Sequence, residues 1–327
     1  MKKLIKIPRD ADIPLVGTVH VGIIDRGTNL LQIRPTSVCN LSCIFCSTDA
    51  GPNSIYRQAD YEAELDYLLG WFEEVATYKE VKIHAFVDSA GEVFTYPKIM
   101  ELLQRLREME IVETVAVETN GTLLDESKIE EMEEIGVDRI NISLHSLNNE
   151  LSKKLVGCKH YDVERIIELI KLIAESKIEV LITPVWIPGI NDSDMEDIIK
   201  FSMEINTNKR FPILGIQKYE EHKFGRKPKG VKQMSWWKFF RKLEEWEKKF
   251  NVKLKLKPQD FDIRKTRMYP IVMKRGEKVR VMVKCLGWIK GEMIGVARNR
   301  AVTIVNCQNA PGDLVRVRIL RNKHNLY

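Results

Sequence analysis

Hydrophobic residues in the first two thirds of the chain alternate between short continuous runs and runs with helical spacing. The continuous runs, which predict buried strands, lie at 29–34, 81–87, 112–117, 139–144, 178–187 and 211–217. Between them, apolar residues recur three to four positions apart and predict helices at 60–79, 96–109, 126–135, 162–175 and 195–205. Such regular alternation indicates βαβ units around a parallel sheet. The six units are too few for a closed eight-stranded barrel.

The pattern changes towards the C-terminus. A helix predicted at 233–250 is rich in aromatic residues, which we expect to pack in the core; the alternative is that they stack on nucleobases. Short alternating strands then follow at 278–286, 292–297, 300–305 and 314–320. Several short strands within about 60 residues predict a small β-barrel. We therefore expect an α/β domain at 1–258 and a small C-terminal β-barrel at 264–327.

Charge is distributed unevenly along the 327 residues, although the net charge is only +6. Residues 1–209 contain 22 basic and 36 acidic residues, whereas residues 210–327 contain 30 basic and 10 acidic ones. Within the latter, residues 264–327 carry 15 basic and 3 acidic side chains. This segregation favours a polyanion-binding surface near the C-terminus. The alternative is a solvated basic surface of the kind found in thermophiles.

No apolar stretch approaches the ~20 residues that a membrane-spanning helix requires. The first ten residues have neither a long apolar segment nor a small-residue cleavage site, so they do not resemble a secretion signal. We therefore expect a cytoplasmic protein with no membrane partner.

Three of the six cysteines, Cys39, Cys43 and Cys46, form a C-x3-C-x2-C motif. Three thiolates on one short loop can converge on a soft metal centre. A structural zinc site needs a fourth ligand, and the nearest histidines, His20 and His84, are remote in sequence. Three thiolates that hold a [4Fe–4S] cluster instead leave one iron open to a substrate or cofactor. The spacing therefore favours an iron–sulfur cluster, with zinc as the alternative.

The motif, with Phe45 before its last cysteine, resembles the radical S-adenosylmethionine (SAM) superfamily. In that family the open iron binds SAM, and an electron from the reduced cluster releases a 5′-deoxyadenosyl radical. The resemblance implies a [4Fe–4S] cluster held by Cys39, Cys43 and Cys46, with SAM as the second cofactor. It also implies a partial (β/α)6 barrel and a reductant such as ferredoxin or flavodoxin.

A second resemblance lies after the predicted strand at 81–87. Ala90, Gly91 and Glu92 are similar to the family's Gly-Gly-Glu element, whose backbone holds the SAM amino group, although alanine replaces the first glycine. Active sites of parallel barrels lie at the C-terminal ends of the strands, so the position supports the match. Phe45 and these three residues are expected to bind the cofactor.

Three later strand ends carry further candidates. Thr119 and Asn120 are similar to a Thr-Asn-Gly element near the cofactor ribose or the substrate; the alternative is an Asn-Gly turn. Ser143 resembles a cofactor-contacting serine, and His145 could handle substrate or a proton or could be a packing histidine. Ile187 opens a Pro-Gly-x-Asn-Asp-like stretch near the adenine, with a helix-capping loop as the alternative. Together with Thr119 and Asn120, His145 is the catalytic candidate.

Residues 309–319 resemble the closing motif of TRAM domains, OB-like RNA-binding modules of RNA-modifying enzymes. Strand alternation places Arg316 and Arg318 on one face, and with Arg298 and Arg300 they are the RNA-binding candidates. The resemblances imply a radical SAM enzyme that modifies a base in RNA, above all tRNA. One alternative is a radical SAM enzyme that acts on a small molecule or protein, with the barrel used for assembly. Another is a non-enzymatic iron–sulfur or zinc protein that binds RNA.

Overall fold

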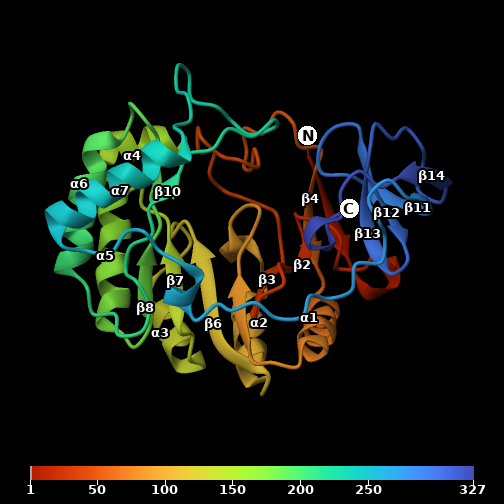
Figure 1. The fold of residues 1–327 in the computed structure, drawn as a ribbon, viewed down its shortest axis with the longest axis horizontal. Helices are drawn as coiled ribbons and strands as arrows, with labels where there is room; N and C mark the ends of the chain where they lie inside the picture. Colours follow the sequence, from red (N-terminus) through yellow and green to blue (C-terminus); the bar gives the residue numbers. More distant parts are fainter. Residues whose placement is uncertain (1) are drawn as a thin grey trace. The chain divides into compact units, whose positions relative to one another are not determined.

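The structure is a computed structural model that describes residues 2–327. Contacts within the chain divide it into two compact units, whose elements are labelled in Figure 1. The first unit runs up to Cys39 and adds Ser54–Val115 and Arg264–Tyr327. The second consists of Asn40–Asn53 and Ala116–Ile263. The segment from Arg264 onwards shares a unit with the N-terminal part, and the two domains expected from the sequence stay a prediction.

The first unit contains three neighbouring strands of the main sheet. β2 (Gly22–Asp25) pairs antiparallel with β3 (Leu30–Arg34), and β3 pairs in parallel with β5 (Ile83–Val87). Two helices, α1 (Leu65–Lys79) and α2 (Ile99–Glu108), belong to the same unit. The predicted strands and helices in this part of the chain are confirmed, apart from one boundary.

That boundary is the start of the helix predicted at 60–79. Residues Ala59–Ala63 form a strand, β4, which pairs in parallel with β1 (Lys3–Ile7), and α1 begins only at Leu65. The partner strand lies more than 50 residues away in sequence, so local periodicity does not reveal it. Tertiary pairing here overrides helical spacing.

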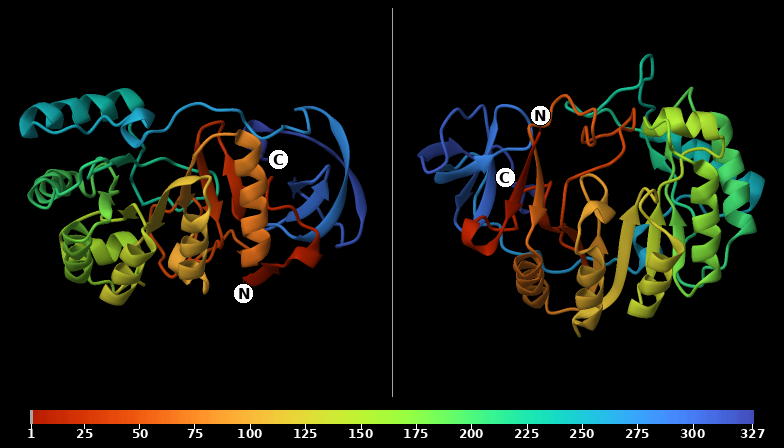
Figure 2. Two further views of the ribbon diagram at one scale, coloured as in Figure 1. Left: turned by 90° about the horizontal axis from the view of Figure 1, so that it is seen from below. Right: turned by 180° about the vertical axis from the view of Figure 1, so that it is seen from behind.

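The second unit continues the βαβ pattern. β6 (Val112–Thr119) runs into it from the first unit and pairs in parallel with β7 (Arg139–Ile142), which pairs with β8 (Glu179–Ile182). Figures 1 and 2 show helices on the outer face of these strands. The helices of this unit are α3 (Glu126–Ile135), α4 (Asn149–Val156), α5 (Val163–Glu175), α6 (Asp192–Glu204) and α7 (Trp236–Phe250).

Aspartate side chains cap the starts of two of these helices, and a glycine closes the end of one. Asp125 accepts a hydrogen bond from the Lys128 N–H at the start of α3 (2.9 Å), and Gly136 closes the helix at φ 84°. Asp162 caps α5 in the same way. Each cap satisfies backbone groups that have no partner inside the helix.

The sixth strand predicted at 211–217 is reduced to fragments. Leu214 forms a single bridge with Ile182, and β10 (Gln217–Lys218) pairs with the two-residue β9 (Val185–Trp186). The Glu179 carboxylate accepts the N–H groups of Lys209, Arg210 and Phe211, which removes these donors from strand pairing. The observed fold is a mixed α/β sheet with this last strand broken.

The C-terminal segment forms an antiparallel sheet in the order β13-β12-β11-β14. Its strands are β11 (Lys278–Leu286), β12 (Glu292–Ala297), β13 (Arg300–Val305) and β14 (Leu314–Arg318). Alternate residues of β11 are buried in its core, namely Val279, Val281 and Val283. The four predicted strands are confirmed, and their closure into a barrel stays a prediction.

This sheet is attached to β4 within the first unit. The Gln58 side-chain amide lies 2.8–3.1 Å from the carbonyl oxygens of Gly287, Ile289 and Glu292. The Tyr61 hydroxyl donates to the Leu286 carbonyl (2.7 Å). These contacts explain why the C-terminal strands share a unit with β4.

Candidate active site

The three motif cysteines are half-buried, and they divide between the units: Cys39 ends a segment of the first, and Cys43 and Cys46 lie in the second. We call residues 40–53 the cysteine loop. Within it, the Cys46 N–H donates to the Cys43 carbonyl (3.2 Å), and the Ala50 N–H donates to Cys46 Sγ (3.3 Å). An N–H donor to sulfur stabilises a thiolate, so this contact suits Cys46 as a ligand of an iron–sulfur cluster.

The cysteine loop is seated on the end of α4. The Ser42 N–H donates to the Val156 carbonyl (3.0 Å), and the Ile44 N–H donates to the Leu155 carbonyl (2.9 Å). Gly157 ends the helix at φ 62°, and a Cβ there would lie 2.3 Å from the Ser42 carbonyl oxygen. Glycine at this position therefore permits the close approach of loop and helix.

Arg226, which no sequence signal singles out, also holds the cysteine loop. Its Nε donates to the Cys43 carbonyl (2.6 Å), its Nη2 to the Ala50 carbonyl (2.6 Å), and its backbone N–H to the Cys46 carbonyl (2.8 Å). Its Nη1 forms an ion pair with Asp49 (2.8 Å). One residue thus contacts the backbone of two motif cysteines.

Two predicted site residues from separate strand ends come together around Phe45 of the cysteine loop. Phe45 packs in one hydrophobic cluster with Leu155, Ile187 and Tyr219. Its ring lies edge-on to the His145 ring, with centroids 4.8 Å apart and an interplanar angle of 80°. The second unit therefore brings Phe45, His145 and Ile187 into one place.

His145 is a buried and neutral histidine. Burial lowers its pKa to about 4, so the ring carries no charge at pH 7. Its Nδ1 accepts the Val185 N–H (3.1 Å), which leaves the proton on Nε2. This geometry suits a hydrogen-bond donor and does not suit a cation; a catalytic role for His145 stays a prediction.

Asn191 joins two of the strand ends. It is fully buried, and its side chain accepts the Ile187 N–H (2.7 Å) and donates to the carbonyls of His145 (2.8 Å) and Val185 (3.0 Å). Its side chain is therefore used to fix the backbone around Ile187 and does not cap α6. Ser143 is half-buried just beyond β7, and its predicted cofactor contact remains a prediction.

The turn after β6 is connected to the cysteine loop. Asn120 Nδ2 donates to Asn40 Oδ1 (3.0 Å), and Asn40 Nδ2 donates to Thr122 Oγ1 (2.7 Å). Thr119 is buried and accepts the Gly121 N–H (3.0 Å), with Gly121 at φ 78°. The Asn-Gly turn is confirmed, and in addition Asn120 anchors the residue that follows Cys39.

In the first unit, the loop of Ala90, Gly91 and Glu92 lies against the residue before Cys39. The Glu92 N–H donates to the Val38 carbonyl (2.7 Å), and a Cβ on Gly91 would lie 2.1 Å from the same oxygen. The glycine of this element is therefore required for the close approach, whereas Ala90 is compatible with it.

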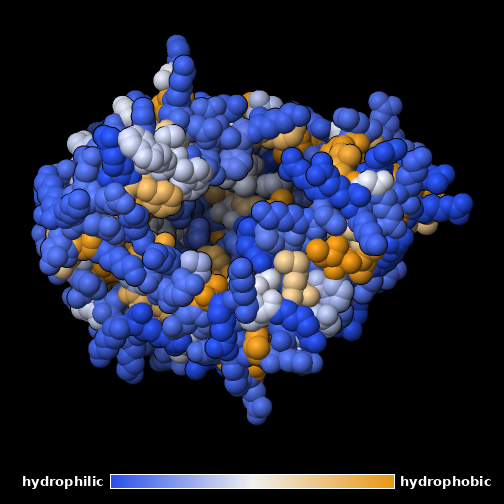
Figure 3. Space-filling view, in the orientation of Figure 1, coloured by the Kyte–Doolittle hydropathy of each residue, from blue (hydrophilic) through white to orange (hydrophobic). Residues whose placement is uncertain are grey.

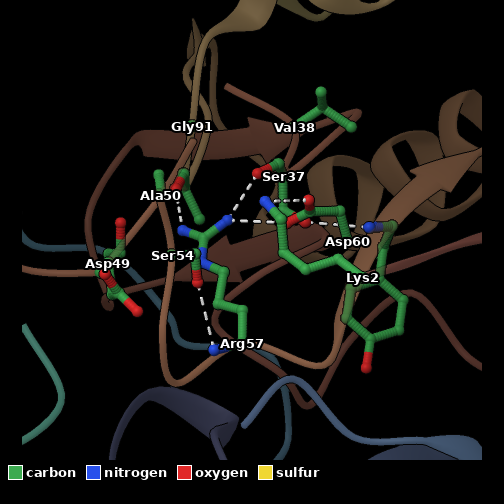
Figure 4. Close-up of polar contacts among 12 residues, drawn as sticks. Lys2, Ser37, Val38, Asp49, Ala50, Ser54, Arg57, Asp60 and Gly91 are labelled. Carbon is green, nitrogen blue, oxygen red and sulfur yellow. Dashed lines mark hydrogen bonds and ion pairs between the residues drawn. The ribbon is translucent and has the colours of Figure 1, made fainter. Parts of the chain in front are cut away.

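Arg57 also contacts this loop, and Figure 4 shows its guanidinium directed towards Ser37 and Asp60. It is 2% exposed, and its guanidinium donates to the carbonyls of Ser37 (2.7 Å) and Ala90 (2.5 Å) and to the Asp60 carboxylate (2.8 Å). It also lies 4.3 Å from the centroid of the Trp288 ring. Arg57 thus links the segment before Cys39, the Ala90 loop and the C-terminal sheet within the first unit.

The four arginines predicted to bind RNA divide into two pairs. Arg316 and Arg318 are exposed on β14. Arg300 is 3% exposed and donates to the Pro270 carbonyl (2.8 Å), so burial contradicts a contact with RNA. Arg298 is exposed but engaged in an ion pair with Glu277 (2.6 Å).

Comparison with known proteins decides the family. Residues 33–202 match the family model of the radical SAM superfamily. The chain belongs to this superfamily. The match includes the cysteine motif and the strand ends described above, and the [4Fe–4S] cluster and SAM predicted as cofactors are those of radical SAM enzymes. Along residues 2–327, no helix is long and apolar enough to cross a membrane.

Three similar proteins illustrate the range of relatives. The uncharacterized protein MJ0103 of Methanocaldococcus jannaschii is 38% identical over 96% of this chain and 78% of its own length. The GTP 3′,8-cyclase of Aquifex aeolicus is 28% identical over 58% of this chain and 57% of its own. The crystal structure of Streptococcus suis SuiB bound to precursor peptide SuiA has a TM-score of 0.54 at 18% identity, covering 71% of this chain and 48% of SuiB. The chain spans about half the length of the Aquifex aeolicus cyclase and of SuiB. The chain and SuiB have a similar fold.

Proposed function

We propose that this radical SAM enzyme modifies a base in RNA, with tRNA as its substrate. Cys39, Cys43 and Cys46 would hold the cluster, and SAM bound there would supply the radical chemistry that removes a hydrogen atom from the substrate. A reductant such as ferredoxin or flavodoxin supplies the electron, and the enzyme acts in the cytoplasm. The observation that supports an RNA substrate is a group of four cations on the C-terminal sheet, which we call the basic face: Lys278, Arg280, Arg316 and Arg318.

The basic face results from strand register. Lys278 lies directly opposite Arg318, and Arg280 lies directly opposite Arg316, on the antiparallel strands β11 and β14. All four side chains are exposed, while the valines between them face the core of the sheet. Figure 3 shows mostly hydrophilic surface over these strands. Lys278 and Arg280 were not among the sequence candidates, because their positions opposite the arginines follow from the register alone.

The four cations of the basic face have no partner among residues 2–327, where none of them forms an ion pair or a side-chain hydrogen bond. Like charges directly opposite on paired strands destabilise a sheet by roughly 0.2–1 kcal/mol per pair. A bound phosphate backbone reverses this effect, because each cation then neutralises an anion and releases counterions.

Protection of a sheet edge is another use of exposed cations. β14 is an edge strand, so Arg316 and Arg318 alone could serve that purpose. β11, however, lies between β12 and β14, and it carries the other half of the basic face. Edge protection therefore accounts for two of the four cations, and phosphate binding accounts for all of them.

Contacts from such a face position an RNA and carry no sequence information. Selection of the base would then depend on the strand-end residues around the cofactor, such as Asn120 and His145. This division of roles predicts binding that is weakly selective among RNAs and strongly dependent on salt.

A small-molecule or protein substrate is the second candidate, with the C-terminal sheet used for assembly. The relatives named GTP 3′,8-cyclases favour a nucleotide such as GTP, although the chain spans only about half of such a relative. Under this alternative, RNA would neither bind with a steep salt dependence nor change the rate of SAM cleavage.

Salt-dependent tRNA binding tests the proposal. We expect the logarithm of the affinity to fall linearly with the logarithm of the salt concentration, measured by fluorescence anisotropy on the folded protein. The Arg316→Gln/Arg318→Gln variant should reduce the slope by about 0.7–0.9 for each lost phosphate contact. Arg298→Gln is the matched control, because that arginine already has a carboxylate partner. Equal slopes in all three proteins would contradict an RNA-binding basic face.

A further inference from the structure

We infer that Arg226 is a positioning residue for the iron–sulfur cluster, because it fixes the peptide group whose N–H donates to Cys46 Sγ. That peptide group joins Asp49 to Ala50. The inference rests on membership in the radical SAM superfamily and is independent of an RNA substrate.

Arg226 holds this peptide group from both sides. On one side its Nη1 pairs with the Asp49 carboxylate (2.8 Å), and on the other its Nη2 donates to the Ala50 carbonyl (2.6 Å). Asp49 adopts a left-handed backbone conformation with φ 51°, which is unfavourable for a residue with a side chain. Its side chain is 0% exposed, so the carboxylate needs a cation as a partner. The ion pair therefore stabilises the turn that directs the Ala50 N–H towards Cys46.

The same residue contacts the start of the cysteine loop. Its Nε and its backbone N–H donate to the carbonyls of Cys43 and Cys46, respectively. The preceding Gly225 lies so close that an added Cβ would be 3.0 Å from the carbonyl oxygens of Cys46 and Ser47. Arg226 and Gly225 thus hold both motif cysteines of the second unit through their backbone.

The segment that carries Arg226 is itself fixed in place. Glu221 and Gln233 join the two ends of this segment. The Glu221 N–H donates to the Gln233 side chain (3.1 Å), and the Gln233 N–H donates to the Glu221 side chain (3.3 Å). Val231 of this segment packs against the hydrophobic cluster that contains Phe45. Arg226 therefore reaches the cysteine loop from a folded segment, and its side chain is not free on the surface.

This arrangement has a consequence for the electronic properties of a bound cluster. An N–H donor to a ligating sulfur and a nearby cation both favour negative charge on the cluster. The reduced form carries one more electron, so both contributions raise the reduction potential. Loss of Arg226 should therefore lower the potential as well as weaken the retention of iron.

Arg226→Gln is the direct test, with Lys229→Gln as the matched control. Lys229 lies in the same segment but is exposed. After anaerobic reconstitution without RNA, we expect Arg226→Gln to hold less than half the iron and sulfide of the parent protein. In a potentiometric titration followed by electron paramagnetic resonance, its remaining clusters should have a more negative midpoint, while Lys229→Gln should match the parent in both measurements.

A double variant distinguishes a specific effect on the cluster from misfolding caused by an unpaired buried carboxylate. In Asp49→Asn/Arg226→Gln, no uncompensated carboxylate remains buried, so the fold should be retained while the guanidinium is still missing. The lost cation and the lost carboxylate offset each other in charge, so the remaining effect comes from the loosened Ala50 N–H donor to Cys46. We therefore expect a midpoint potential more negative than that of the parent, a shift that a purely structural role would not cause. Full iron content with an unchanged midpoint in the double variant would overturn the inference. Because no RNA is present, neither result bears on the proposed substrate.

Discussion

Two groups of arginines in this protein have opposite environments. Arg57 is buried in the first unit and Arg226 is half-buried in the second, and each donates to backbone carbonyls and to a carboxylate. Arg316 and Arg318 lie on an exposed strand, opposite other cations and without a partner among residues 2–327. The first group stabilises the protein by satisfying internal acceptors. The second should destabilise it slightly, because its arginines lie directly opposite other cations on the paired strand.

Arg57→Ala should have the largest effect on the free energy of unfolding. It leaves the Ser37 and Ala90 carbonyls without this donor and removes a guanidinium from the Trp288 ring. Loss of one member of a buried ion pair typically costs about 3–5 kcal/mol, and we expect the lower end because Asp60 keeps Lys2 as a partner. Urea unfolding under anaerobic conditions measures this loss in the free energy of unfolding. A loss below about 1 kcal/mol, as expected for the exposed control Arg298→Ala, would remove the distinction between the two groups.

His20 tests a third case, a buried polar group with no partner. Its ring is stacked on Tyr61, and neither ring nitrogen has a hydrogen-bond partner among residues 2–327. Burial first, and then the charge of Arg57, lower its pKa to about 3. At pH values between about 3 and 6.5, the unfolded chain binds more protons at His20 than the folded protein does. The contribution of neutral His20 to stability is therefore fully present above pH 6.5 and is lost progressively as the pH is lowered.

The matching variant is His20→Phe, which retains an aromatic ring and removes the titrating group. Relative to neutral pH, the parent should lose about 1.4 kcal/mol at pH 5.5 through this histidine alone, and the variant should lack that share of the loss. Unfolding free energies measured at pH 7.5 and 5.5 give the comparison. Identical losses in both proteins would show that His20 is not held neutral by the fold.

Arg316→Gln/Arg318→Gln should have a small effect on stability, and the effect should have the opposite sign. Because both arginines face other cations across the strands, their removal should raise the free energy of unfolding by about 0.4–2 kcal/mol in total at low salt. The gain should shrink as salt screens the repulsion. If the variant is instead destabilised, the arginines have partners within the protein and belong with Arg57 and Arg226.

Features with local sequence signals could be predicted. The strands of the C-terminal sheet have nearly the predicted bounds, because their valines alternate regularly. The cysteine motif and the turns at Ala90 and Asn120 occur at the expected strand ends, because glycine and asparagine mark those turns.

Features that depend on long-range contacts could not be predicted. The pairing of β1 with β4 joins segments that are more than 50 residues apart, and it shortens a predicted helix. Arg57 and Arg226 donate to carbonyl oxygens, which every residue possesses and which leave no trace in the sequence. Arg300 and Arg316 both lie in alternating strands, and only packing buries the first and exposes the second.

Formation of 5′-deoxyadenosine tests the central claim most directly. The reconstituted, reduced protein is supplied with SAM alone, with SAM and total tRNA, or with SAM and GTP. We predict that tRNA accelerates formation in the parent but not in the variant with glutamine at all four positions of the basic face, while both proteins show the same slow rate with SAM alone. Formation that is indifferent to tRNA, or that is accelerated by GTP instead, would contradict an RNA substrate.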